Sequence, residues 1–93
     1  MKSPACELAP TRHFTERYIE RRIYALSRSE ELMQRILQAL SRGDFRRDEK
    51  HRGVEGPRYQ LAIKLGNRRL VVICEKTRSC FKLITLWIAG RDA

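Results

Sequence analysis

The chain has 93 residues, 42% of them hydrophobic, and 20 Lys and Arg against 11 Asp and Glu give it a formal net charge of +9. A chain of this length forms one domain with a core of its own, and its apolar fraction argues against wholesale disorder. The longest apolar run is Leu70–Cys74, far short of the ~20 apolar residues that span a bilayer. The N-terminus lacks the apolar segment of a secretory signal. We therefore expect a cytoplasmic protein without a membrane partner.

The first half of the chain predicts two helices. Residues 1–11 show no periodicity and are expected to be a flexible lead-in to a single α+β domain over 12–93. Apolar residues recur at helical spacing from Arg12 to about Leu26. A second helix should begin at Ser27 or Ser29, since Ser27 and Glu30 have the spacing of a capping box, and should end before Gly43.

The second half predicts strands. Residues 44–57 are polar, contain two glycines and a proline, and are expected to form a long loop. Arg58–Leu65 alternates between polar and apolar residues, "GN" at 66–67 suits a hairpin turn, and "RLVVIC" and "CFKLITLWIA" continue as strands. The order predicts an α+β fold in which both helices pack on one face of an antiparallel three- to four-stranded meander.

The positive charge predicts a polyanionic partner, most commonly a nucleic acid. Fifteen of the 20 basic residues are Arg, which grips phosphate with a planar fork and stacks on bases; an Arg-rich proteome would give the same composition. The candidate nucleic-acid-binding residues come from the loop and from one side of the first long strand. They are Arg46, Arg47, Lys50, Arg52, Arg58 and Lys64.

The three cysteines form no CxxC pair and have no His at ligand spacing, so we expect no zinc site. The sequence shows no metal-ligand cluster and no glycine-rich phosphate loop, so we also expect no other metal site and no cofactor. Cys74 and Cys80 flank a hairpin. A disulfide between them is conceivable, but buried free thiols are favoured.

His13, Arg17 and Arg21 recur at intervals of four and therefore lie on one line of the first helix. His suits proton transfer near neutral pH, and two Arg side chains could hold a phosphate. Because Glu16 and Glu20 are interleaved, the same line could be an ordinary charged surface. Thr85 interrupts the apolar run of "KLITLWI", either as a β-branched strand residue or as a polar group facing a substrate. Strict alternation puts Lys82 and Thr85 on opposite faces.

These pieces together resemble a family of small prokaryotic proteins of unassigned activity. Its first helix has the form H-x-x-x-R-x-x-x-R-G-I and its last strand resembles V-I-T-V-Y; here Arg22 stands at the family's glycine, and "LITLW" matches the strand. The family is similar in architecture to RelE-like toxins, of the barnase, EndoU, colicin and RelE ribonuclease class. The resemblance implies His13 as general acid or base, Arg17 and Arg21 on the scissile phosphate, and Thr85 as an orienting group.

The resulting expectation is a RelE-like toxin-type domain that acts on RNA, either as a metal-independent endoribonuclease or as a degenerate descendant. The alternative is a non-catalytic basic nucleic-acid-binding protein, of viral or mobile-element origin. RNA is preferred over DNA as the partner, and an acidic antitoxin-like protein is a further candidate. The sequence leaves the oligomeric state open, a dimer included.

Overall fold

A computed structural model describes residues 8–50, 56–78 and 80–91. Within them, the elements follow in the order β1–α1–η1–α2–β2–β3–β4–β5. The helical elements are α1 (Arg12–Glu20), the 3-10 turn η1 (Ile23–Ala25) and α2 (Ser29–Arg42). The strands are β1 (Leu8–Pro10), β2 (Phe45–Arg47), β3 (Arg58–Leu65), β4 (Arg68–Lys76) and β5 (Phe81–Arg91).

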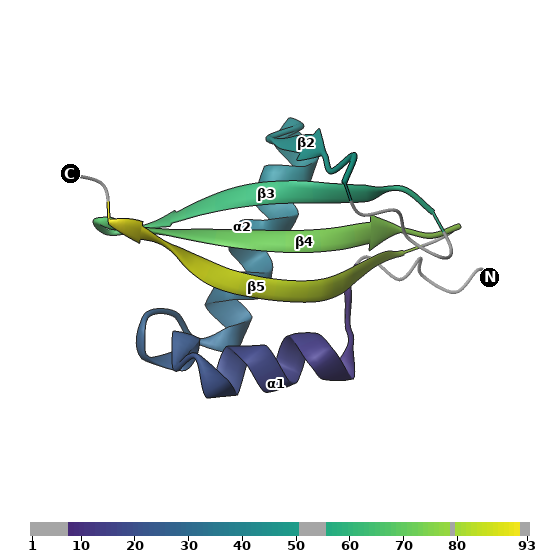
Figure 1. The fold of residues 1–93 in the computed structure, drawn as a ribbon. Helices are drawn as coiled ribbons and strands as arrows, with labels where there is room; N and C mark the ends of the chain where they lie inside the picture. Colours follow the sequence, from purple (N-terminus) through teal and green to yellow (C-terminus); the bar gives the residue numbers. More distant parts are fainter. Residues whose placement is uncertain (1–7, 51–55, 79, 92–93) are drawn as a thin grey trace.

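The strands form one sheet in the order β1-β5-β4-β3-β2 (Figure 1). The α+β class is confirmed, but the expected three to four antiparallel strands are wrong: the described residues form five, and β1 pairs with β5 in parallel. The two additional strands are three residues each, too short to show an alternating pattern. β1 lies in the segment expected to be a lead-in and β2 in the expected loop.

The first helical segment is shorter than its periodicity suggested. α1 ends at Glu20, and Arg22 has a left-handed backbone with φ of 53° before η1 begins. A residue in this conformation cannot continue a right-handed helix. Tyr18 then ties the turn to α1, because its hydroxyl donates to the Ser27 carbonyl at 2.7 Å.

α2 matches the prediction at its end and differs at its start. Gly43 follows it with φ of 77°, the left-handed conformation that glycine adopts at no steric cost. The expected capping box is wrong: Arg28 occupies the capping position without a side-chain hydrogen bond, and Ser27 is buried one residue earlier. Glu30 and Glu31 still occupy the first turn, where the helix dipole favours negative charge.

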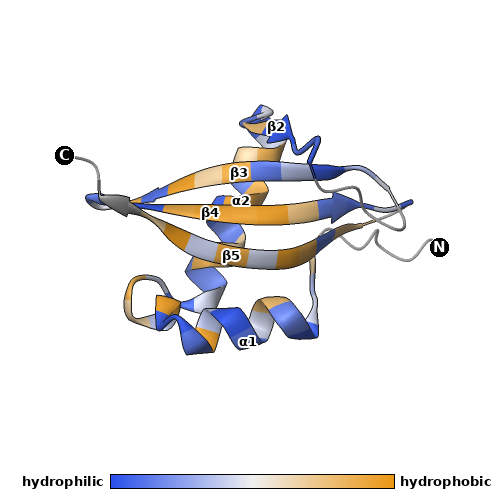
Figure 2. Cartoon of the chain, viewed as in Figure 1, coloured by the Kyte–Doolittle hydropathy of each residue, from blue (hydrophilic) through white to orange (hydrophobic). Residues whose placement is uncertain are grey.

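Both helices pack on the same face of the sheet. α2 crosses behind the three long strands, while α1 runs beside β5 (Figure 1). Hydropathy follows this arrangement, with apolar residues gathered in the middle of the long strands and polar residues at their ends (Figure 2). The core between helices and sheet consists of Phe14, Ile23, Leu32, Ile36, Ala39, Leu61, Ile63, Leu70, Val72, Cys74, Leu83 and Leu86.

A bulge in β5 decides which residues face the helices. Ile73 lies opposite Thr85 but Cys74 lies opposite Leu83, so Ile84 has no partner residue on β4. One extra residue in a strand moves the side chains on either side of it out of alternation, so that residues an odd number apart share a face of the sheet. Lys82 and Thr85 therefore share a face, and the expectation that they lie on opposite faces is wrong.

The cysteines behave differently from one another. Cys80 is disulfide-bonded, whereas Cys74 is a free thiol in the core. Hence Cys74 and Cys80 do not pair, and the expectation of two buried free thiols holds for Cys74 alone. Burial raises the pKa of the Cys74 thiol to about 12, which keeps it protonated and unreactive at neutral pH.

Candidate functional site

α1 lies along the outer edge of β5 and is held there at both ends. At its start, the Thr11 hydroxyl donates to the Leu83 carbonyl at 2.7 Å and accepts from the Phe14 N–H at 3.2 Å. Just past its end, Arg21 Nη1 donates to the Leu86 carbonyl at 2.7 Å. The helix thus covers the part of the β5 edge that β1 does not pair with, where backbone groups would otherwise be open to pairing with another strand.

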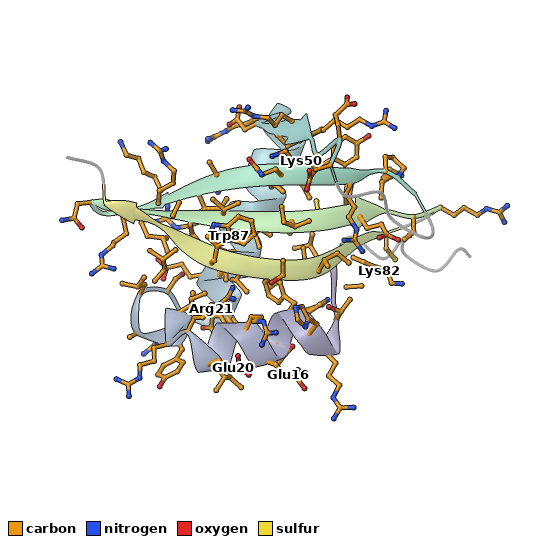
Figure 3. All side chains as sticks on the ribbon, in the orientation of Figure 1. Glu16, Glu20, Arg21, Lys50, Lys82 and Trp87 are labelled. Atoms are coloured by element: carbon orange, nitrogen blue, oxygen red, sulfur yellow. The ribbon has the colours of Figure 1, made fainter. Side chains whose placement is uncertain are left out.

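The predicted line of His13, Arg17 and Arg21 has a distinct environment at each position. Arg21 lies between α1 and β5, whereas Glu16 and Glu20 lie on the side of α1 away from the sheet (Figure 3). Arg17 is half-buried, and its Nη1 lies 2.6 Å from Glu20 Oε1. His13 is exposed, and no hydrogen bond or ion pair joins it to another described residue.

Thr85 lies on the face of the sheet that no described helix covers. We call this the open face; β2 to β5 contribute to it Arg46, Arg58, Gln60, Ala62, Lys64, Arg69, Val71, Ile73, Glu75, Lys82, Thr85 and Trp87. Thr85 immediately precedes Leu86, whose carbonyl accepts from Arg21. The structure therefore brings Arg21 to the edge of β5 one residue after Thr85, with Arg17 and His13 further along α1. No hydrogen bond between Thr85 and these three side chains is present among the described residues.

The predicted nucleic-acid-binding residues are divided by the fold. Arg46, Arg58 and Lys64 lie on the open face, because Arg46 is opposite Gln60 and the other two alternate with it along β3. Arg47 is opposite Tyr59 and lies on the other face. Lys50 is exposed beyond β2, where its N–H donates to Asp48 Oδ1 at 3.2 Å. Arg52 lies outside the described residues.

A charged row across three strands was not found from the sequence. Arg58, Glu75 and Lys82 lie opposite one another on β3, β4 and β5. Arg58 Nε is 2.9 Å from Glu75 Oε1, and Glu75 is only 3% exposed. The three residues are far apart in the sequence, so they can be recognised as one row only when the strand register is known.

A second row on the open face is apolar and was also not found. Trp87 lies opposite Val71, and Val71 lies opposite Ala62. Figure 3 shows Trp87 over the middle of the sheet, on the side away from α2. Past Ala62, the row meets a shallow hollow of about 340 Å³ lined by Gly43, Asp44, Phe45, Arg46, Gln60 and Ala62. Lys64 and Arg46 border this strip with positive charge.

Three further features of the described residues concern metal binding, membrane spanning and a second hollow. The described part of the chain contains no group of three or more His, Cys, Asp or Glu that could hold a metal ion. No helix in it is long and apolar enough to cross a membrane. A second hollow, of about 350 Å³ between α1 and α2, is mainly apolar and lined by no charged side chain.

Comparisons with protein-family models, curated proteins and solved structures find no match to this chain.

Proposed function

We propose that this protein is a RelE-like domain that acts on RNA as a metal-independent endoribonuclease. One observation carries the proposal: α1 lies against β5, with Arg21 bonded to the Leu86 carbonyl directly after Thr85. An RNA strand that crosses the edge of β5 from the open face would therefore reach the His13–Arg17–Arg21 line. The net charge of +9 supports a polyanionic substrate.

The resemblance to RelE-like ribonucleases implies the reaction. The ribose 2′-OH attacks the adjacent phosphorus, the bond from phosphorus to the 5′-oxygen breaks, and the products are a 2′,3′-cyclic phosphate and a 5′-OH end. His13 would move a proton at the attacking or the leaving oxygen. Arg17 and Arg21 would stabilise negative charge on the phosphate oxygens, and Thr85 would orient the substrate.

The test is cleavage of an end-labelled single-stranded RNA in EDTA. We expect the wild type to yield cyclic-phosphate ends, and His13→Ala to lower the rate by about 10²- to 10⁴-fold, the usual contribution of general acid–base catalysis. Arg12→Gln is the matched control, because Arg12 is on the same helix with a 92% exposed side chain; its rate should stay near the wild-type value. Wild-type protein without activity, or equal cleavage by His13→Ala, would contradict the proposal.

Non-catalytic RNA binding is the second candidate, and specific contacts favour it. Arg21 already donates to a backbone carbonyl and Arg17 is paired with Glu20. No described residue orients the His13 ring, as the partner of a catalytic imidazole normally does. The same assay separates the candidates, since RNA that is bound but intact in both wild type and His13→Ala would favour binding alone.

A further inference from the structure

Trp87 is the only tryptophan of the chain, and it lies where tryptophan has no core to fill. Its strand position faces away from the helices, and the side chain is partly exposed. Among the described residues, no other aromatic ring or cation stacks on it, and its indole N–H donates no hydrogen bond. A large apolar ring is thus presented on the open face next to a strip of small and aliphatic side chains.

The residues around Trp87 match a flat apolar ligand that has a negatively charged group at one edge. Val71 is 9% exposed and Ile73 is 5% exposed, so both are largely covered by their neighbours, and they form the apolar floor of the open face beside the ring. Ala62 continues the floor across β3, and neighbouring strands are spaced ~4.8 Å apart. Lys64 lies on one side of this floor and Gln60 on the other, both on β3.

We infer that the open face binds single-stranded RNA, with one unpaired base stacked on Trp87 and the backbone following Lys64 and Arg46. This rests on the proposed action on RNA and adds the class of substrate. Bases offer their π-faces only when unpaired, whereas an A-form duplex presents mainly phosphates and 2′-hydroxyls. Stacking on aromatic side chains beside a basic groove is how single strands are held without sequence readout. An apolar floor would leave the backbone of a duplex without partners.

The experiment uses the fluorescence of Trp87, which no other tryptophan obscures. The probe is a 2′-O-methyl oligouridine of about ten nucleotides, within the site sizes of single-strand binders; it lacks the attacking hydroxyl and cannot be cleaved. Binding is followed independently by the anisotropy of a dye on the probe. We expect the probe to quench Trp87 as it binds. A duplex of equal length and inorganic polyphosphate should bind without quenching.

Variants separate stacking from charge. Trp87→Ala should weaken binding of the probe by about 5- to 150-fold, the range for loss of one stacked base. Trp87→Phe keeps an aromatic face and should weaken it less, which also guards against a folding defect in the alanine variant. Tyr24→Ala is the matched control, since Tyr24 is 52% exposed on η1, away from the open face, and its removal should leave affinity unchanged.

The outcomes distinguish this inference from the proposed function. Binding without quenching, with Trp87→Ala as tight as the wild type, would overturn the stacking site and leave action on RNA standing. Equal quenching by duplex and single strand would overturn the preference for unpaired bases. No binding to any of the three polyanions would overturn the stacking site and the proposed function together.

Discussion

Glu75 is a buried carboxylate, which is rare for an acidic side chain unless it is paired. It is 3% exposed, yet it lies on the open face, where Arg58 binds it at 2.9 Å and Lys82 lies opposite it. A carboxylate can be buried this way when a cation compensates its lost hydration. Glu75 therefore holds the Arg58 guanidinium in place on the surface that we assign to RNA.

Glu75→Gln should lower the free energy of unfolding by about 2–4 kcal/mol, measured by urea denaturation. Removing one partner of a buried ion pair costs about 3–5 kcal/mol, and the partial exposure of Arg58 reduces this. Glu16→Gln breaks the exposed Arg12–Glu16 pair at 3.2 Å and is the control, with an expected cost below about 0.5 kcal/mol. If both variants lost the same small amount, Glu75 would not hold this row together.

At the scale of elements, Arg22 separates α1 from η1. Its φ of 53° lies where an L-residue other than glycine pays about 1–2 kcal/mol. The chain reverses its direction here, and this reversal brings α2 behind the sheet (Figure 1).

Arg22→Gly should accordingly raise the free energy of unfolding by about 0.5–1.5 kcal/mol, once the greater flexibility of glycine in the unfolded chain is subtracted. Arg22→Ala carries the same steric penalty as Arg22 and should leave stability near the wild-type value. Thermal and urea unfolding of the three proteins provide the measurement. A stability gain in the alanine variant equal to that in the glycine variant would show that charge, not backbone strain, is relieved.

The elements that could be predicted are those long enough to show a period. α2, the hairpin at 66–67 and the three long strands follow from helical or alternating patterns, and Gly43 adopts the expected left-handed conformation. β1 and β2 could not be predicted, because three residues carry no period. The β5 bulge was missed because an apolar run does not reveal an extra residue.

The candidate site was predictable only where it lies on one element. The spacing of His13, Arg17 and Arg21 is a property of the helix and could be read directly. The rows containing Glu75 and Trp87 depend on which residues of three strands lie opposite one another. Register is a property of the whole sheet, so these rows could not be assigned before it was known.

At the scale of the whole molecule, the charge of +9 attracts any polyanion, and the fold decides where a strand is held. Release of counterions lowers log K by ~0.7 per log unit of salt for each phosphate contact with a single strand. Arg46→Gln with Lys64→Gln should therefore reduce the salt slope by about 1.4. The control removes the same charge away from the open face, at Arg12 and Arg28, both exposed. Anisotropy titrations between about 50 and 200 mM salt measure both slopes, and equal reductions would mean that RNA is held by net charge and not by the open face.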